Sequence, residues 1–419
     1  KALGMTIIVT DHHEVPYKEN EAGRRYILPP ADAVVDPRQE GCEYPFKGLC
    51  GAAVAYKLIE ALSEVNGQDV ADLDYLLENV AIATVADVMD LTEENRILVK
   101  QGLEMLTRTS NLGLRALIQC IGLEGKKIQA YHIGFILAPC LNASGKLDTA
   151  KRALALLRAK TEREADMLAG DLKALNESRR DMTDRVVDEA MAKVEQTDIR
   201  EDKVLVIYLP DCHESLAGLV AGRVRENYYR PVFVLTDSED GVKGSGRSIE
   251  SYSMYEELTG CGDLLTKFGG HPMAAGLSLD KENVEKFKRR LNDQCTLSEE
   301  ELTEKVVIDM ELPFTAITEH FIEELECLEP FGKGNAKPVF AARGVIMQHV
   351  KIIGKNKNVA KATAIDASGN RMEAICFRDA QEFAEQCERN NGKMSITFYP
   401  GINEFRGERQ IQIVITHYR

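Results

Sequence analysis

The chain has 419 residues, of which 44% are hydrophobic and 28% charged, a composition ordinary for globular protein and a length that suggests about three domains. It has no apolar run near the ~18 residues that a membrane span needs and no signal-peptide pattern, so no membrane association is expected. Ten cysteines without a Cys-x-x-Cys pair argue against a structural zinc site and a secreted disulfide framework, which makes a reducing cytoplasm the expected location.

The formal net charge is −15, and it is unevenly distributed. Residues 331–419 hold 7 Lys and 7 Arg against 8 Asp and Glu, a local net of +6, so the remainder carries −21. A basic end on an acidic body favours a protein that binds a polyanion locally, although a soluble surface with accidental asymmetry gives the same numbers.

The first 150 residues alternate β-like apolar runs with helical patterns, which is typical of α/β proteins. Thr6–Thr10 is rich in β-branched residues and predicts a buried strand that ends directly at Asp11. Helices are expected around Gly51–Leu62 and Ala71–Ala83. Lys151–Gln196 contains no Pro and has apolar residues at helical spacing, which predicts one long connecting helix or two.

A second α/β unit is expected from Lys203 onward, with strands at 204–210 and Pro231–Thr236 on either side of a helix at Ser215–Glu226. Another helix is expected through Asn283–Leu291, and the acidic residues 299–304 indicate a linker or a helix start. Short β-like runs then predict a small antiparallel barrel. These runs are Val339–Ala342, Ala374–Phe377, Ser395–Tyr399 and Gln410–Thr416.

Asp11, His12 and His13 directly follow the first predicted strand. The carboxyl ends of strands in open α/β sheets line the crevice where ligands bind. A carboxylate and a neutral imidazole are suitable ligands for Mn²⁺ or Mg²⁺, with a neighbour that fixes the ring tautomer. Two adjacent His residues on a loop also arise by chance, so the tripeptide alone leaves metal binding open.

Asp87 follows an apolar helical stretch and has small neighbours, which leave room for a metal and a phosphate near the backbone. Alternatively, Asp87 caps the helix that begins around Glu93. Taken alone, the second interpretation is the stronger one.

Two glycine-rich pieces, GSGRS at 244–248 and GGHPMAAG at 269–276, combine glycines with hydroxyl groups, one Arg and one His. Glycine permits close backbone approach, and N–H groups, hydroxyls and a guanidinium together form an anion cradle. Two tight turns would explain the glycines as well. Both pieces are expected on loops.

In chain order, TDHH, VADVMD, GSGRS and GGHPMAAG resemble the DHH phosphodiesterases that carry a DHHA1 substrate-binding domain. Four further pieces resemble the RecJ branch of that family, the single-stranded-DNA-specific exonucleases. They are FKGLCGAAVAYKL (46–58), LAPCLNASGKLDTA (137–150), HESLAGLVAGRV (213–224) and LEPFGKGNAKPVF (328–340). The last lies in that branch's oligonucleotide-binding (OB) fold, in agreement with the basic barrel, and the likeness spans nearly the whole chain.

The resemblance implies an α/β fold with four parts: a DHH-type parallel-sheet domain (1–150), a connecting helix (151–196), a smaller α/β DHHA1 domain (197–296) and an OB-like barrel (297–419). It implies a hydrolase that cleaves phosphodiester bonds of single-stranded DNA, 5′ to 3′, in DNA repair and recombination. Single-stranded DNA is the implied partner, together with a single-strand-binding protein or a helicase.

Two divalent ions, Mn²⁺ or Mg²⁺, are the implied cofactors, about 3.5–4 Å apart in such sites. The resemblance places His12 and Asp87 as metal ligands. It implies that Asp11 and His13 support the ligands or contact the phosphate, although Asp11 is also grouped with the ligands, and His13 is the candidate catalytic residue. Substrate contacts fall on a further set of residues: Asn142, Ser245, Arg247, Ser248, Gly269, Gly270 and His271. On the barrel, basic residues would follow the phosphates of a strand. Phe377, Tyr399 and Phe405 are candidate stacking faces, whereas Phe398 is expected in the barrel core.

The chain departs from the family pattern in two respects. Cys140 and Lys146 replace the first and last Arg of an Arg-(Ile/Leu)-Asn-Ala-(Ala/Ser)-Gly-Arg landmark, and Lys lacks the bidentate fork of Arg while Cys also lacks its charge. The family's Asp-x-Asp motif and a further Asp supply most of the metal-binding carboxylates and would precede Lys1. The 419 residues alone are therefore expected to be inactive.

Three other functions compete with this one. A short-oligoribonucleotide or cyclic-dinucleotide phosphodiesterase needs no barrel, so residues 331–419 argue against it. A non-catalytic replication scaffold with a DHH fold tends to lose the DHH and GGH residues, and both are present here. A pyrophosphatase of the same superfamily uses a different second domain and lacks GGHPMAAG.

Overall fold

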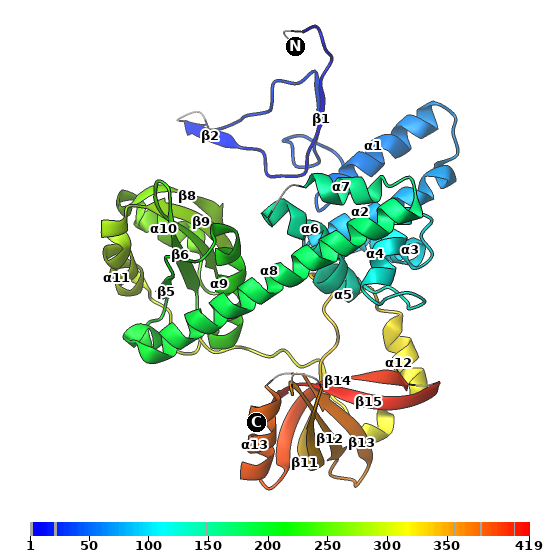
Figure 1. The fold of residues 1–419 in the computed structure, drawn as a ribbon, viewed down its shortest axis with the longest axis vertical. Coiled ribbons are helices and arrows are strands. Elements are labelled where there is room, and N and C mark those ends of the chain that lie inside the picture. The colour runs from blue at the N-terminus through cyan, green and yellow to red at the C-terminus, as the bar shows by residue number, and fades with distance from the viewer. Residues whose placement is uncertain (1–2, 21–22, 148–149, 355–356, 378, 406) are drawn as a thin grey trace. The chain divides into compact units, whose positions relative to one another are not determined.

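The computed structural model describes residues 3–20, 23–147, 150–354, 357–377, 379–405 and 407–419 (Figure 1). The chain divides into two compact units. The first combines Lys1–Ser110, Leu123–Ala138 and Val306–Arg419, and the second combines Asn111–Gly122 with Pro139–Lys305. No helix in the described ranges is long and apolar enough to cross a membrane.

The first part of the first unit contains short strands followed by helices. β1 (Ile8–Thr10) and β4 (Ala33–Val35) pair in parallel, and β2 (Tyr17–Asn20) forms an antiparallel hairpin with β3 (Gly23–Tyr26). The predicted strand at Thr6–Thr10 is therefore present, but it is not buried, because Ile8 is 59% exposed. Among the described strands, only β4 pairs with β1.

The helices of this part are α1 (Gly51–Val65), α2 (Leu77–Ala86), α3 (Glu93–Thr107) and α5 (Ala130–His132), which continues as a π-helical turn over Ile133–Leu137. The helix predicted at Ala71–Ala83 is in fact a 3₁₀ helix at Val70–Leu76 followed by α2. Helices α1, α2 and α3 share one apolar core. α2 and α3 lie very close together, because a Cβ atom on Gly102 would clash with the backbone carbonyl of Leu77.

The last part of the first unit is a closed barrel. It contains β11 (Phe340–Ile353), β12 (Val359–Ile365), β13 (Arg371–Cys376), β15 (Glu408–Tyr418) and β14 (Lys393–Phe405) in that spatial order, and β14 pairs back with β11. α12 (Glu319–Glu326) precedes the barrel, β10 (Met310–Glu311) pairs with β11, and α13 (Ala380–Arg389) joins β13 to β14.

This strand order is that of an OB fold, a five-stranded Greek-key barrel, drawn in orange to red in Figure 1. The predicted barrel is confirmed. It is not wholly antiparallel, because β13 runs parallel to β15. Alternate residues of β12 point inward, namely Ala360, Ala362 and Ala364, and the core around them includes the fully buried Phe398.

The second unit begins with helices. They are α4 (Leu112–Cys120), α6 (Ala138–Leu147), α7 (Lys151–Leu157) and the long α8 (Glu162–Gln196). For Lys151–Gln196, where one helix or two were expected, the structure shows two, α7 and α8. Thr161 begins α8 by accepting a hydrogen bond from the N–H of Glu164, the usual role of an N-cap Thr.

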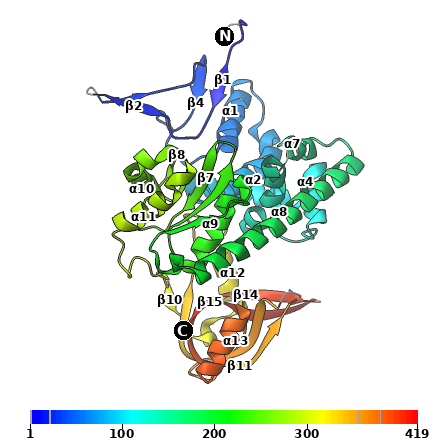
Figure 2. The ribbon, with the colours of Figure 1, turned by 60° about the vertical axis from the view of Figure 1, so that its left-hand side comes forward.

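A five-stranded sheet forms the rest of the second unit. It contains β5 (Leu205–Tyr208), β6 (Val232–Ser238), β7 (Gly241–Arg247), β9 (Ala274–Leu279) and β8 (Leu265–His271) in that spatial order. α9 (Glu214–Tyr228) packs with α8 on one face, and α10 (Met254–Gly260) packs with α11 (Val284–Gln294) on the other (Figure 2). β5 and the first four residues of β6, Val232–Leu235, are almost entirely apolar because both of their faces are buried.

The glycines of both pieces lie in strands. GSGRS falls almost wholly in β7, so the prediction of a loop is wrong there, whereas GGHPMAAG forms the β8–β9 hairpin, with its turn at Pro272 and Met273. A Cβ atom on Gly246 of β7 would clash with Met254 and lie 2.7 Å from the ring of Phe233. Gly270 of β8 has a φ of +147°, and its Cβ would lie 2.6 Å from the Cα of Ala275. These glycines make room for neighbouring side chains and strands rather than for a turn.

Candidate metal centre and substrate-binding surfaces

Asp11, His12 and His13 follow β1, and their potential ligand atoms lie within 4.8 Å of one another. The N–H of Asp11 donates to the carbonyl of Val35, which fixes the start of this loop against β4. Asp11 Oδ1 accepts hydrogen bonds from His13 Nδ1 at 2.7 Å and from the His12 N–H at 2.7 Å. The hydrogen bond from the His13 ring, followed by that from the His12 backbone, lowers the pKa of Asp11 to about 2.

An ionised carboxylate can only accept hydrogen bonds, so the His13 ring must carry its proton on Nδ1. In the neutral form of the ring, Nε2 of His13 is then an acceptor, and this side chain is 76% exposed. Asp11 therefore fixes the tautomer of His13 and presents its free nitrogen to the surroundings.

His12 faces Asp87, although the two residues are far apart in the sequence. His12 Nε2 lies 3.6 Å from Asp87 Oδ2, and the side chains are 17% and 53% exposed. That distance is too long for a good hydrogen bond, so the two atoms face one small space without being bonded to each other. Gly51, the first residue of α1, lies against the His12 ring, because its Cβ would be 3.4 Å from His12 Cδ2.

Asp87 is the residue at which α2 ends. Its N–H donates to the carbonyl of Ala83, and the N–H of Met89 donates to that of Thr84, which closes the helix. The alternative in which Asp87 caps the next helix is wrong, because Thr92 is the N-cap residue of α3. Val88 has a φ of +55° and turns the chain away from the helix axis directly after Asp87.

The second unit carries the candidate substrate contacts on one face of its sheet. β7 points Lys243, Ser245 and Arg247 to this face, since side chains alternate along a strand. The Arg247 guanidinium lies over Gly218 of α9, where a Cβ would be 2.8 Å from Arg247 Nη2. Burial, followed by repulsion from Arg225, lowers the pKa of Arg247.

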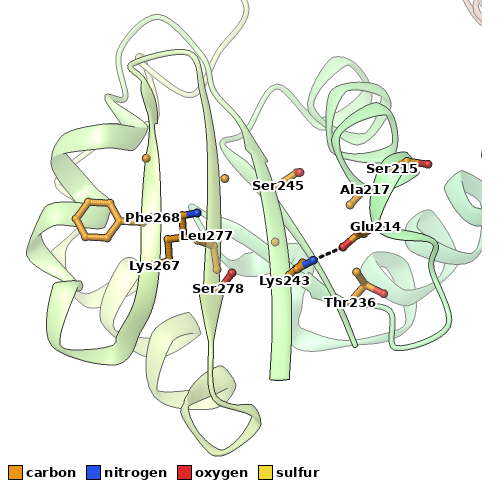
Figure 3. Close-up of a pocket in the computed structure, with 13 residues that line it drawn as sticks. Glu214, Ser215, Ala217, Thr236, Lys243, Ser245, Lys267, Phe268, Leu277 and Ser278 are labelled. Atoms are coloured by element: carbon orange, nitrogen blue, oxygen red, sulfur yellow. Dashed lines mark hydrogen bonds and ion pairs between the residues drawn. The ribbon is translucent and has the colours of Figure 1, made fainter. Parts of the chain in front are cut away.

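A hollow of about 460 Å³ opens on the same face, beside α9 (Figure 3). Ser245 of β7, Lys267 of β8 and Ser278 of β9 line it. Lys243 also lines it and forms an ion pair of 2.6 Å with Glu214 at the start of α9. Ser215 and Thr236 line it as well, so two lysines and four hydroxyls stand against one carboxylate, which suits an anionic ligand.

The remaining predicted contacts are distributed over this unit. Gly269 lines the hollow, and His271 is exposed at the end of β8, opposite Ala274 of β9. Ser248 is buried, and its hydroxyl donates to the carbonyl of Tyr252 at 2.5 Å. That hydroxyl is used inside the fold, so a substrate contact by Ser248 stays a prediction without geometric support.

Asn142 is exposed on α6, two residues after the buried Cys140. Burial raises the pKa of the Cys140 thiol to about 11, which makes it a poor nucleophile at neutral pH. Asn176 of α8 contacts that thiol and accepts a hydrogen bond of 2.8 Å from Arg179. A guanidinium therefore lies near the position at which the family landmark has its first Arg. The side chain of Lys146 lies outside the described residues.

On the barrel, Phe377 is 61% exposed, whereas Phe398 is fully buried as expected. Tyr399 is partly buried, with Lys337 Nζ 3.9 Å from the centre of its ring. The side chain of Phe405 lies outside the described residues.

Sequence reasoning did not single out Lys243, Lys267 or Glu214. The signal for Lys243 was available, because Lys243, Ser245 and Arg247 recur with the period of two that a strand requires. Lys267 and Glu214 lie at the hollow through sheet order and helix position, which one sequence does not reveal.

Comparison with known proteins gives consistent results. The family model of the DHHA1 domain matches residues 201–297, and that of the RecJ OB domain matches residues 308–417. The chain is 36% identical over 420 residues to the single-stranded-DNA-specific exonuclease RecJ of Bacillus subtilis, which covers 99% of the chain and 51% of that protein. It is 33% identical over 437 residues to RecJ of Salmonella typhimurium, which covers 99% of the chain and 73% of that protein.

A solved structure agrees with these relatives. The crystal structure of RecJ in complex with Mn²⁺ from Thermus thermophilus matches with a TM-score of 0.80 at 27% identity, over 99% of this chain and 58% of that chain. The chain thus spans about half of the Bacillus protein and nearly three quarters of the Salmonella protein.

Proposed function

The chain belongs to the RecJ family. We propose that it functions in a metal-dependent exonuclease that hydrolyses phosphodiester bonds of single-stranded DNA. The proposed direction is 5′ to 3′, and the proposed setting is DNA repair and recombination. The observation that carries the proposal is the approach of His12 Nε2 to Asp87 Oδ2 at 3.6 Å. An OB barrel and an anion-suited hollow in the same chain support a nucleic-acid substrate.

We assign Mn²⁺ or Mg²⁺ to the site that His12 and Asp87 face, with Asp11 beside it. The donor set fits, because an imidazole nitrogen and a carboxylate oxygen, two atom types that bind such ions, face one space without a shared hydrogen bond. When bound, paired divalent ions would polarise the scissile phosphate and supply the attacking hydroxide.

The protein's own residues would orient the reaction. Asp11 holds the His13 ring through Nδ1, which leaves Nε2 to accept a proton or, when protonated, to contact the scissile phosphate. In the DHHA1 part, Arg247, Ser245 and the Gly269–His271 strand would bind substrate phosphates, and Asn142 and Ser248 are assigned there from the resemblance. Single-stranded DNA is the proposed partner. A single-strand-binding protein or a helicase would deliver this DNA to the enzyme, which would act in the cytoplasm.

The same proposal divides the chain into a DHH part (1–150), a connecting helix (151–196), a DHHA1 domain (197–296) and an OB domain (297–419). The helix boundary is supported by the start of α7 at Lys151 and the end of α8 at Gln196. The metal site would be completed by further carboxylates, so the activity test uses the protein that contains this chain in full length.

The test compares wild type with His12→Ala and Asp87→Ala on 5′-labelled single-stranded DNA, with Mn²⁺ or Mg²⁺ added after chelation. Both variants should lose Mn²⁺ binding, measured by electron paramagnetic resonance, and at least about 100-fold in cleavage rate, because even groups that only orient a metal ligand cost up to about that much. His320→Ala, which changes an 81% exposed His on α12, is the matched control.

Undiminished cleavage by both variants would contradict the proposal. A wild type that prefers dinucleotides or cyclic dinucleotides would favour the short-substrate phosphodiesterase. Tight DNA binding without cleavage under any metal would favour a scaffold.

A further inference from the structure

The segment that leads into the barrel lies against the loop that carries Asp87. We call residues Leu328–Asn335 the connector and residues Asp87–Thr92 the Asp87 loop. Both belong to the first unit, and about 240 residues of chain separate them.

The Asp87 loop has a backbone that its sequence does not favour. Val88 and Glu93 bracket the loop with φ values of +55° and +44°, in the left-handed region that side chains other than glycine rarely adopt. A β-branched residue such as Val88 is especially disfavoured there, and this side chain is 62% exposed, so burial does little to compensate. Contacts from outside the loop must therefore stabilise this conformation.

The connector supplies such contacts between the two strained residues. The N–H of Leu91 donates to the carbonyl of Lys333 at 2.7 Å, and Lys333 Nζ lies 3.0 Å from Asp90 Oδ1. Gly334, with a φ of +75°, lies so close that its Cβ would be 3.1 Å from Asp90 Cβ and 3.1 Å from Thr92 Cγ2. The two segments fit together through backbone, charge and close packing.

The connector is itself held on both sides. Asn335 Nδ2 donates to the carbonyls of Leu328 and Pro330 at 2.8 and 2.9 Å, which folds the connector on itself. Arg96 of α3 donates to the Leu328 carbonyl at 2.9 Å, and Lys127 lies 3.1 Å from Glu329. Because these contacts fix the connector independently of the Asp87 loop, the connector can restrain the conformation of that loop.

From these contacts we infer that the connector is a positioning element of the metal centre. Lys333 and Gly334 hold the Asp87 loop in its strained conformation and so keep the Asp87 carboxylate opposite His12. Metal affinity then depends on residues at the entrance of the barrel that lie outside the ligand set. This inference rests on the proposed function, since it assumes that the metal binds at His12 and Asp87.

The experiment measures Mn²⁺ affinity by electron paramagnetic resonance, and thermal unfolding, on the full-length protein. Gly334→Ala should weaken Mn²⁺ binding about tenfold, the lower range for disturbing groups that orient a metal ligand. Lys333→Ala should weaken it by about fivefold at most, because the ion pair is exposed, and Lys333→Arg should restore it. The matched control is Gly369→Ala, since Gly369 also has a positive φ (+85°) but no atom within 4 Å of a Cβ.

The outcomes separate the two proposals. If Gly334→Ala and Lys333→Ala bind Mn²⁺ as Gly369→Ala does, while His12→Ala loses binding, the connector has no positioning role and the metal site stands. If Mn²⁺ binding is unaffected by His12→Ala, both proposals fall. Weakened binding in both connector variants at unchanged thermal stability, with rescue by Lys333→Arg, supports the inference and excludes a purely structural role.

Discussion

Asn95 ties together the two segments that flank the candidate metal centre. It lies in the first turn of α3 and is fully buried. Its Nδ2 donates to the carbonyl of Gly48, just before α1, at 2.7 Å and to that of Asp90, in the Asp87 loop, at 3.0 Å. Asn95→Ala would leave both carbonyls without this donor.

The expected magnitude follows from those two carbonyls. A buried acceptor that loses its partner costs about 1–3 kcal/mol. Because the loop can relax around the vacated space, we expect a combined loss of about 3 kcal/mol in the free energy of unfolding. The position of Asp87 relative to His12 should change as well, so Mn²⁺ affinity should fall.

Urea denaturation of the apo-protein and Mn²⁺ titration measure the two effects. The control is Asn292→Ala, since Asn292 forms a similar pair of hydrogen bonds, donating to the carbonyl of Val204 and accepting from its N–H at 3.0 Å each. That variant should lose stability while Mn²⁺ affinity stays unchanged. A loss below about 0.5 kcal/mol for Asn95→Ala, the range of neutral surface changes, would refute this reasoning.

Three further predictions concern substrate, pH and salt. Arg247→Ala should weaken binding of a labelled single strand, measured by anisotropy, about tenfold through loss of charged hydrogen bonds; lost Mn²⁺ binding in calorimetry would overturn its substrate role. Burial raises the pKa of Glu78, so its ionised form opposes folding above that raised pKa, and the penalty disappears as pH falls below the ordinary value of 4.5. Glu78→Gln should therefore raise the urea midpoint at pH 7 but not at pH 4, and an equal midpoint at pH 7 would count against it. Phe377→Ala should weaken single-strand binding by about 1–3 kcal/mol if a base stacks there. The affinity of wild type for the strand should fall steeply as the salt concentration rises. Binding that does not depend on salt would mean that the barrel has only a structural role.

The sequence predicted the main elements and the meeting of His12 with Asp87, because both predictions rest on local patterns and a known motif order. It did not predict the role of the glycines in the two glycine-rich pieces. Gly246 and Gly270 serve packing inside strands, and nothing in the local sequence distinguishes a glycine that permits a turn from one that makes room for a neighbour.

Other features depend on contacts between distant parts of the chain. The capping alternative for Asp87 failed because α2 continues to Ala86, Val88 then turns the chain in the left-handed conformation, and Thr92 is the N-cap of α3. The contact of the connector with the Asp87 loop has no local signal at all, since Lys333 and Asp90 form an ordinary Lys–Asp pair on the surface. One sequence without its fold gives no reason to pair them.

The close crossing of α2 and α3 has a consequence for mutational surveys. Any side chain on Gly102 would force the two helices apart at the Leu77 carbonyl, and α2 ends at Asp87. A saturation survey scored by DNA-repair phenotype should therefore rank Gly102 among the least tolerant positions, beside His12, although Gly102 contacts neither metal nor DNA in the proposed mechanism. Such a survey would then identify both the residues of the catalytic centre and the residues that hold its helices in place. Only metal titration of purified variants would distinguish the two groups.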